Sequence, residues 1–496
     1  MKTLLLFIVG IVSLASFGQD GGLDTSFGNN GTVQTDIDGD SDYAISIAQQ
    51  ADEKLLVAGR FTIQGQAFPS IARYSINGNL DTSFGNNGVA IFGGSGYEDD
   101  YYEIVLSQND GKIIAGGPFN LNSSYQYAVN RFLPDGSIDT SFGNNGEIIV
   151  FPENIYKGDL ALLDDDSLLA VGKIYDNGIS KVALKKYTSN GMLDTSFGNN
   201  GVVITEVGNE SNSALKVALA QDDTIVVLAN SQDNGVSSQV LLRYMPNGVL
   251  DTAFGNNGMV TIVNDLDFSS SNIALYNDGK IAVLSSFFDY QFNIITNLIS
   301  RYLSDGSFDT SFGNNGYINP NRNNFIISRI EVQENQRLLV FGELTDFFEG
   351  GGPFFINRYH LGGHLDTGFN FTINPSEYFV SNMLIQQDGK IVCLASTPWY
   401  NGQEDIIMER HINTPLSTPE FKNQITTIYP NPSNGVFTIE RDLFSENTSF
   451  QITDITGKII AKGELNDTQT QIDFSVAQAG VYFLKTADGV FRLLKN

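Results

Sequence analysis

The sequence predicts an all-β protein, a seven-bladed β-propeller followed by a small C-terminal β-sandwich. A nine-residue segment returns at nearly constant spacing, and Asn-Gly and Asp-Gly pairs, which favour tight antiparallel turns, recur between short β-rich runs. The chain has 496 residues, more than one hydrophobic core accommodates, so at least two folded units are expected.

The first twenty residues have the pattern of a secretory signal peptide. Lys2 supplies a positive charge, and Leu4 to Ala15 form an apolar run that is shorter than the ~20 residues needed to span a membrane. Ser16 and Gly18 are the small residues of a cleavage site, which predicts removal of residues 1–18. No other stretch of the sequence is apolar enough to form a membrane span.

The repeated segment, which we call the anchor, reads Leu-Asp-Thr-Ser-Phe-Gly-Asn-Asn-Gly in its first copy. Successive copies are 57, 58, 55, 57, 58 and 57 residues apart, a regularity that indicates a repeat architecture. The anchors begin at Leu23, Leu80, Ile138, Leu193, Leu250, Phe308 and, in degenerate form, Leu365.

Each repeat carries four β-rich runs, which we call a, b, c and d. In the second repeat, a is Val89–Phe92, b is Glu103–Leu106, c is Lys112–Gly116, and d ends in a basic–aromatic pair, Arg131 and Phe132. Four short strands with an Asp-Gly turn between b and c are typical of a propeller blade. A parallel β-helix is the alternative, but it would not need the b–c hairpin.

The two ends of the repeat region predict that the propeller, residues 19–414, closes into a ring. The chain begins with an anchor that has no d strand before it, and Pro415 and Pro419 in the linker (415–424) replace an anchor after the seventh d strand. We expect the anchor at Leu23 to dock beside that strand, which ends at Arg410. Closure of this kind removes exposed sheet edges.

The anchor residues have a local explanation. The aspartate of each copy is expected to accept hydrogen bonds from the following backbone amides, and the phenylalanine to be buried between blades, contributing about 2–3 kcal/mol each. In the alternative, the seven aspartates face a central channel and hold a ligand. The repeat resembles the delta-sixty repeat family over about residues 23–414, which implies a propeller but no activity; Gly368 and Asn370 depart from its motif.

The segment 425–496 has a different composition and reads as a separate β-sandwich. Its Pro-Asn-Pro (430–432), Gly-Lys (457–458) and Gly-Val-Tyr (480–482) elements are similar to the type A sorting domain of the Bacteroidota type IX secretion system. This resemblance implies that the secretion machinery is a partner, and that the protein is secreted or held at the cell surface. An adhesive immunoglobulin-like module is the alternative.

Composition excludes several functions. A formal net charge of −28 repels phosphate backbones and anionic lipid, so we expect neither nucleic acid nor membrane as a partner. One cysteine, Cys393, and three histidines leave few groups for metal binding, and no motif indicates a cofactor or a catalytic residue. The run Asp36–Asp42 faintly suggests a calcium loop, but its glycine is misplaced.

The candidate binding residues are aromatic. In a propeller, b–c turns and d–a connections share one face, and a–b and c–d loops share the other; here only the second, which we call the loop face, varies between repeats. Burial between blades is the alternative for each aromatic. The candidates are Trp399, Tyr400, Phe347, Phe348, Phe288 and Tyr290.

The preferred hypothesis is a non-enzymatic protein that binds extracellular glycan or protein through the loop face. A propeller enzyme, a polysaccharide hydrolase or lyase using two channel carboxyl groups about 5–10 Å apart, is the first alternative. A structural scaffold for surface display is the second.

Overall fold

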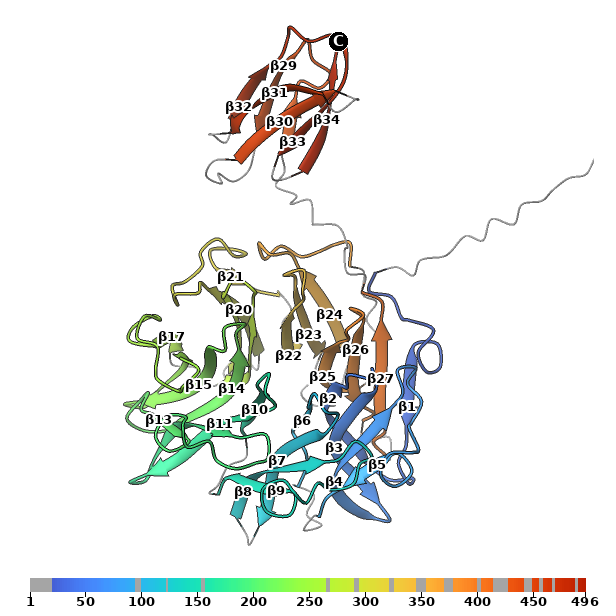
Figure 1. The fold of residues 1–496 in the computed structure, drawn as a ribbon, viewed down its shortest axis with the longest axis vertical. Coiled ribbons are helices and arrows are strands. Elements are labelled where there is room, and N and C mark those ends of the chain that lie inside the picture. The colour runs from blue at the N-terminus through green and yellow to red at the C-terminus, as the bar shows by residue number, and fades with distance from the viewer. Residues whose placement is uncertain are drawn as a thin grey trace, which may run out of the picture. The chain divides into compact units, whose positions relative to one another are not determined.

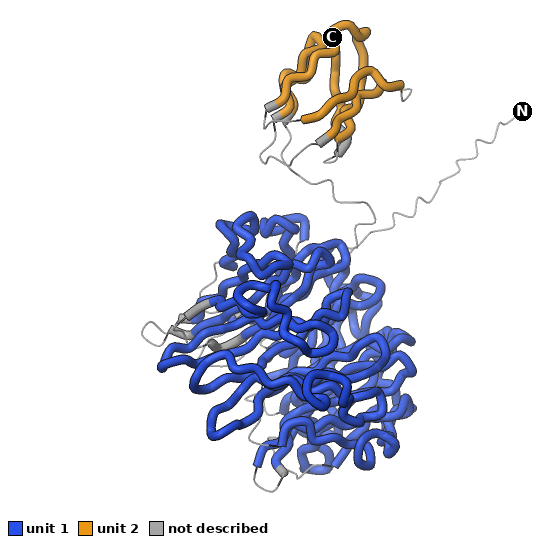
Figure 2. The backbone as a smooth tube through the Cα atoms, turned by 60° about the vertical axis from the view of Figure 1, so that its left-hand side comes forward, with its two compact units in different colours: residues 1–414 blue, residues 415–496 orange. Residues whose placement is uncertain are grey.

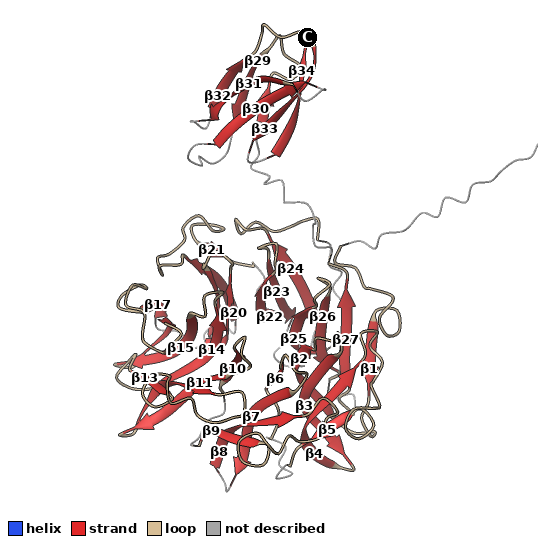
Figure 3. Ribbon diagram, in the orientation of Figure 1, coloured by secondary structure: helices blue, strands red, loops and turns tan. Residues whose placement is uncertain are grey.

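The structure, a computed structural model, describes residues 20–93, 100–121, 124–152, 157–264, 268–289, 294–320, 325–344, 354–369, 378–398, 403–413, 427–440, 448–454, 458–465, 469–486 and 489–496. The expected signal peptide (1–18) and linker (415–424) lie outside these residues. Two compact units, residues 1–414 and 415–496, make up the chain (Figure 2). The regular secondary structure of the described residues consists of β-strands (Figure 3). The described residues contain no helix that is long and apolar enough to cross a membrane.

The described part of the first unit contains seven antiparallel sheets, numbered here in the order of their innermost strands. Sheet 1 contains β2 (Asp42–Gln49), β3 (Leu55–Ile63), β4 (Gln66–Tyr74) and β5 (Val89–Ile91). Sheet 2 contains β6 (Ile104–Ser107), β7 (Ile113–Leu121), β8 (Ser124–Phe132) and β9 (Glu147–Phe151). Sheet 3 contains β10 (Asp159–Leu162), β11 (Leu168–Asp176), β12 (Ile179–Tyr187) and β13 (Val202–Thr205). Sheet 4 contains β14 (Asn212–Leu219), β15 (Ile225–Asp233), β16 (Val236–Tyr244) and β17 (Met259–Asn264). Sheet 5 contains β18 (Phe268–Leu275), β19 (Ile281–Asp289), β20 (Ile294–Tyr302) and β21 (Tyr317–Ile318). Sheet 6 contains β22 (Phe325–Val332), β23 (Leu338–Leu344) and β24 (Phe354–Tyr359). Sheet 7 contains β25 (Phe379–Ile385), β26 (Ile391–Ser396), β27 (Ile406–His411) and β1 (Thr32–Thr35).

Sheets 1 to 5 and sheet 7 combine strands from two repeats. Strands b, c and d lie side by side, and the a strand that follows the next anchor pairs with d as the outermost strand. In sheet 7 the outermost strand is β1, where Thr32 lies opposite Glu409 and Leu23 lies opposite His411. The predicted docking of the N-terminal anchor beside the last d strand is confirmed.

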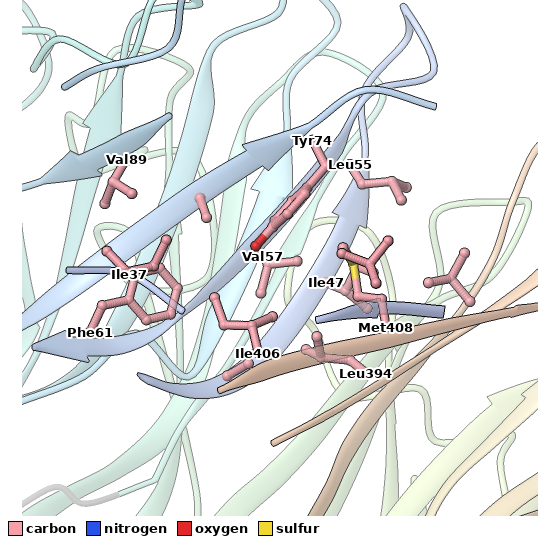
Figure 4. Close-up of a cluster of buried hydrophobic side chains, with 14 of the residues drawn as sticks. Ile37, Ile47, Leu55, Val57, Phe61, Tyr74, Val89, Leu394, Ile406 and Met408 are labelled. Atoms are coloured by element: carbon pink, nitrogen blue, oxygen red, sulfur yellow. The ribbon is translucent and has the colours of Figure 1, made fainter. Parts of the chain in front are cut away.

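The hydrophobic core of this unit lies between neighbouring sheets. The first residues of the c strands are buried on both sides, which explains why they read as continuous apolar runs instead of alternating patterns. Each neighbouring pair of sheets shares one cluster of buried side chains, including the pair formed by sheets 7 and 1. In that cluster Ile406 and Met408 pack with Val57 and Phe61 (Figure 4).

The innermost strands also contact one another in sequence. β2 contacts β6, and the contacts continue through β10, β14, β18, β22 and β25 back to β2 (Figure 1). The chain therefore folds into a propeller-like unit in which side chains of the innermost strands face a shared centre.

The second unit has two described sheets around its own core. One contains β28 (Thr427–Tyr429), β29 (Val436–Glu440) and β32 (Gln469–Asp473). The other contains β30 (Thr448–Asp454), β31 (Ile459–Leu465), β33 (Gly480–Thr486) and β34 (Gly489–Lys495). The rings of Phe437 and Phe474 stack inside this core with their centres 5.2 Å apart, and β30 pairs antiparallel with β31.

Candidate functional site

Five of the six predicted aromatic residues fall in the c–d connections of sheets 5, 6 and 7, whereas the prediction that Phe288 lies in such a connection is wrong. Phe288 belongs to β19, where only its backbone is described, and Tyr290, Phe347, Phe348, Trp399 and Tyr400 lie outside the described residues. The c–d connections of sheets 5 to 7 span residues 290–293, 345–353 and 397–405. In sheets 1 to 4, only two residues separate the c strand from the d strand, at 64–65, 122–123, 177–178 and 234–235. The long c–d connections therefore belong to three consecutive sheets.

The opposite face is occupied by a repeated contact that we call the clasp. Its first component is the anchor aspartate, which accepts hydrogen bonds within its own turn. Asp139 Oδ1, for example, accepts from the Ser141 amide at 3.0 Å and from its hydroxyl at 2.5 Å, as predicted for an Asx turn. Its second oxygen accepts from Arg131 Nε at 2.9 Å.

This pairing of a basic residue from the d strand with the anchor aspartate recurs in all seven copies. The distances lie between 2.6 and 3.5 Å, and the third copy uses lysine in place of arginine. The pairs are Arg73–Asp81, Arg131–Asp139, Lys186–Asp194, Arg243–Asp251, Arg301–Asp309, Arg358–Asp366 and Arg410–Asp24.

The clasp arginine also joins neighbouring sheets. Arg131 lies 4.6 Å from the centre of the Phe142 ring, and its Nη1 donates to the carbonyl of Ser189 in the next sheet. Arg410 does the same across the closing contact, where it donates to the Ile76 carbonyl at 2.5 Å. The basic–aromatic pair noted in the sequence therefore supplies a tie between sheets.

The anchor phenylalanine is the third component of the clasp. All seven copies are buried, as predicted, and Phe254 has no exposed surface. Gly306, in the d–a turn of the next sheet, has a φ of +85°, and a Cβ at this position would lie 3.0 Å from the Phe254 ring. The turn therefore requires glycine for its backbone conformation and for its close packing on the ring.

The clasp removes the anchor aspartates from the set of candidate ligand residues. The Ser83 hydroxyl, with help from Arg73 and Lys54, lowers the pKa of Asp81 to about 2 against the opposing effect of burial. Among the described residues that line the central cavity, no anchor aspartate occurs. The alternative in which these aspartates face the channel is wrong, because their oxygens are used within the clasp.

The central cavity is lined instead by side chains of the innermost strands. It has a volume of about 360 Å³ and receives residues from all seven sheets. One residue from each innermost strand lies opposite the fourth residue of its c strand, and we call these seven residues the channel ring. They are Ser46, Ile104, Asp159, Lys216, Asn272, Arg329 and Asn382.

Four members of the channel ring hydrogen-bond the backbone of a neighbouring innermost strand, and one of them is Asn382, whose Nδ2 donates to the Ile45 carbonyl at 3.4 Å. The Ser46 hydroxyl accepts from the Val105 amide at 3.1 Å, and Asp159 Oδ2 accepts from the Val217 amide at 2.8 Å. Asn272 Oδ1 makes the equivalent contact to the next strand, at 3.3 Å. These acceptors satisfy backbone amides that face the channel, which would otherwise be buried without partners.

The cations of the channel are paired with neighbouring carboxylates. Lys216 Nζ lies 3.6 Å from Asp159 Oδ1, and Arg329 Nη2 lies 2.8 Å from Glu331 Oε2. Arg329 Nη1 also donates to Asn382 Oδ1 at 3.1 Å. The side chains of Lys216, Arg329 and Glu331 keep 32%, 36% and 34% of their surface exposed, so water reaches both pairs inside the channel.

A third carboxyl group, Glu103, also lines the cavity. Burial raises its pKa to about 7, opposed by the charge of Lys216 and reinforced by that of Asp159. Its Oε2 is buried and has no hydrogen-bond partner. Of the three carboxyl groups, Asp159 and Glu331 are already held by cations, which suits hydrogen bonding to a ligand better than proton transfer.

The sequence interpretation missed the channel ring, although a signal was present. Every member lies nine residues before the first residue of its c strand, as Ser46 does before Leu55 and Arg329 before Leu338. Six of these seven positions are polar in strands that are otherwise mostly apolar. Burying a polar side chain costs free energy, so a polar residue that recurs at one position of a buried strand indicates a structural or functional role.

The suspected calcium loop is used locally. Asp36 accepts from the Gly39 amide at 2.8 Å, and Asp38 accepts from the Gln64 amide at 2.7 Å. Within the described ranges, no group of three or more histidine, cysteine, aspartate or glutamate residues is arranged to hold a metal ion.

Parts of both units match known family models. Residues 50–84, 108–142, 163–197, 220–254 and 277–312 match a model described as a domain of unknown function (DUF5122) beta-propeller. Residues 427–495 match the secretion system C-terminal sorting domain. This tail indicates that the protein is secreted or displayed on the cell surface through the type IX secretion system. No curated protein matches the sequence.

Several solved structures are similar to the chain. Polysaccharide lyase Uly1 is 11% identical, with 80% of this chain and 94% of that chain covered and a TM-score of 0.49. Virginiamycin B lyase from Staphylococcus aureus is 11% identical, with coverages of 76% and 98% and a TM-score of 0.42. The propeller domain of the Trilobed protease from Pyrococcus furiosus is 11% identical, with coverages of 77% and 99% and a TM-score of 0.41.

Proposed function

We propose that this protein is an exported, non-enzymatic binding protein, a closed seven-bladed propeller that recognises extracellular glycan or protein through its loop face. The C-terminal unit, a small β-sandwich, directs the chain through the type IX secretion system after the signal peptide is removed. The cycle of contacts among the innermost strands and the pairing of β1 with β27 support the seven blades and their closure.

One observation carries the location of the binding surface. The anchor aspartates and their basic partners on the clasp face bind one another, whereas the long c–d connections, with five of the six candidate aromatic residues, belong to sheets 5, 6 and 7. Aromatic residues grouped beside carboxylates and amides provide stacking surfaces and hydrogen bonds for a sugar or a protein.

The binding proposal is tested with the mature protein, from Gln19 to Asn496, on a glycan array and in pull-downs from a lysate of the neighbouring microbial community. Trp399→Ala with Tyr400→Ala, and Phe347→Ala with Phe348→Ala, should each weaken the detected binding at least ten-fold. Tyr175→Ala, an exposed aromatic beside the two-residue c–d turn of sheet 3, is the control and should bind as the parent does. Binding that survives both double substitutions contradicts the assignment of the surface.

Export is tested separately. A reporter that carries residues 1–18 at its start and 425–496 at its end should reach the outside of a cell with type IX secretion. A reporter that stays in the periplasm while the full chain is exported rules out the sorting role of this unit.

A further inference from the structure

We propose that the central channel is a second binding site, separate from the loop face, and that it takes a small, neutral, hydroxyl-rich ligand of monosaccharide or disaccharide size. The ligand would lie against the Lys216–Asp159 and Arg329–Glu331 pairs, with Asn272 and Asn382 beside them.

The charge balance of the channel favours a neutral ligand. Each of the two cations lies within 3.6 Å of a carboxylate, so the two pairs together carry no net charge. A charged ligand would have to compete with one partner of a pair and would leave that partner without its counter-charge. A hydroxyl group both donates and accepts, so it can bond a carboxylate and a cation that lie side by side.

The polar groups also exceed what the fold needs. Ser46, Asp159, Asn272 and Asn382 tie neighbouring strands together through their backbone groups. Lys216 and Arg329 bond only side chains of neighbouring residues in the contacts described. Both keep about a third of their surface open inside the channel, at 32% and 36%. Two long cations in the centre of an apolar framework lose side-chain freedom, which an apolar residue at the same position would not require.

The framework around these residues is nearly constant, whereas the residues themselves differ. The seven channel-ring positions have one backbone register but carry serine, isoleucine, aspartate, lysine, asparagine, arginine and asparagine. The position opposite the second residue of each c strand is alanine or leucine in six sheets and Glu331 in sheet 6. Of these residues, Leu106, Ala218, Ala274 and Glu331 line the cavity. Polar groups beside a small apolar surface match the hydroxyl groups and the C–H faces of a sugar.

The cavity volume of about 360 Å³ sets the size of the ligand. This volume lies at the lower end of the range of small-molecule sites, about 300–1,000 Å³. It admits one or two sugar rings but not a folded protein segment.

The test is ligand-observed NMR on the mature chain with glucose, galactose, mannose, xylose, N-acetylglucosamine and cellobiose as neutral probes, and glucuronate and glucosamine as charged ones. At least one neutral probe should bind with a millimolar dissociation constant, more tightly than its charged counterpart. Arg329→Met combined with Glu331→Gln removes one pair without leaving a lone charge and should weaken this binding at least ten-fold. Lys181→Met with Asp176→Asn removes a comparable pair outside the channel and should have no effect.

A second variant covers the case in which the first does not fold. Ala218→Phe adds bulk at a lining position and should abolish binding of the same probe. The inference is overturned if no neutral probe binds at 50 mM, or if binding survives a folded channel variant. It is also overturned if binding is lost only with Trp399→Ala and Tyr400→Ala, an outcome that leaves the proposed loop-face function standing.

Discussion

In six of the seven joints between sheets, a single arginine side chain connects three parts. Arg301 pairs with Asp309 at 2.8 Å, lies 4.3 Å from the Phe312 ring centre, and donates to the Leu361 carbonyl of the next sheet. The planar guanidinium makes this possible because its five donors point in fixed directions while its face stacks on a ring. Lysine has one charged group and cannot do all three.

The third clasp is therefore the weakest, and we predict that Lys186→Arg stabilises the protein. Lys186 lies 3.5 Å from Asp194, where six other copies have arginine. The gain should be about 1 kcal/mol in the free energy of unfolding, measured by urea denaturation. The matched control is Arg301→Lys, which should lose a similar amount. If both substitutions changed the free energy of unfolding in the same direction, the proposed role of the guanidinium would be contradicted.

The anchor phenylalanine gives a larger effect. Phe197 is 2% exposed, and Phe197→Ala should cost roughly 3–5 kcal/mol because the surrounding sheets cannot close the cavity. The measurement is the urea midpoint, with the exposed Met192→Ala in the same connection as the control, which should change little. A midpoint equal to that of the parent would show that the ring does not pack the joint.

At the scale of elements, the sheets do not coincide with the sequence repeats. The outermost strand of sheet 1 is β5, which follows the second anchor and so belongs to the next sequence repeat. No repeat follows sheet 7, and its outermost strand is β1 from the start of the unit. β5 is held by chain on both sides, whereas β1 is close to the predicted mature N-terminus.

This difference predicts that equivalent substitutions in the two strands have unequal effects. Val33→Pro removes an amide from the β1–β27 ladder, and Ala90→Pro removes one from the β5–β4 ladder. Val33→Pro should cost about 2–3 kcal/mol and expose the N-terminal segment to protease, because only hydrogen bonds and packing hold it in place. Equal protease sensitivity in the two variants would contradict a closing role for β1.

Much of this arrangement could be predicted from the sequence, because each repeat restates the same turn and strand signals. The Asx turn at Asp139, the burial of Phe254 and the pairing of Leu23 with His411 all follow from local patterns and from counting strands. The contact of Arg131 with the next sheet could not be predicted, because it depends on how sheets stack. The channel ring was missed because period-two patterns in short strands do not show which face meets the centre.

At the scale of the whole molecule, two groups of acids respond to pH in opposite directions. Asp24 and Asp81 have pKa values of about 2 in the folded protein, below the 3.8 of a free side chain, so the stability they contribute is lost as the pH falls from about 4 to 2. Burial raises the pKa of Asp42 to about 8 and those of Glu103 and Glu343 to about 7. The folded state binds these protons more tightly than the unfolded state, so stability falls as the pH rises from about 4 to 8.

We therefore predict that the melting temperature is highest at about pH 4–5, where both groups are favourable. Glu343 accepts from the Val380 amide at 3.0 Å, a bond that glutamine retains, so Glu343→Gln should reduce the fall in melting temperature between pH 5 and 8. Asp388→Asn, an exposed carboxyl in a b–c turn, is the control and should leave that fall as it is. A melting temperature that climbs steadily from pH 5 to 8 would show that burial of these acids has no such effect.

The sharing of sheet 7 by both ends of the first unit has a consequence for biosynthesis. Asp24 leaves the ribosome early, yet Arg410, which it binds, is made 386 residues later. Strand β1 has no pairing partner until β27 has been translated, so a shorter nascent chain cannot form the β1–β27 pair. The order of the strands along the chain therefore delays completion of sheet 7 until its last strand has been made.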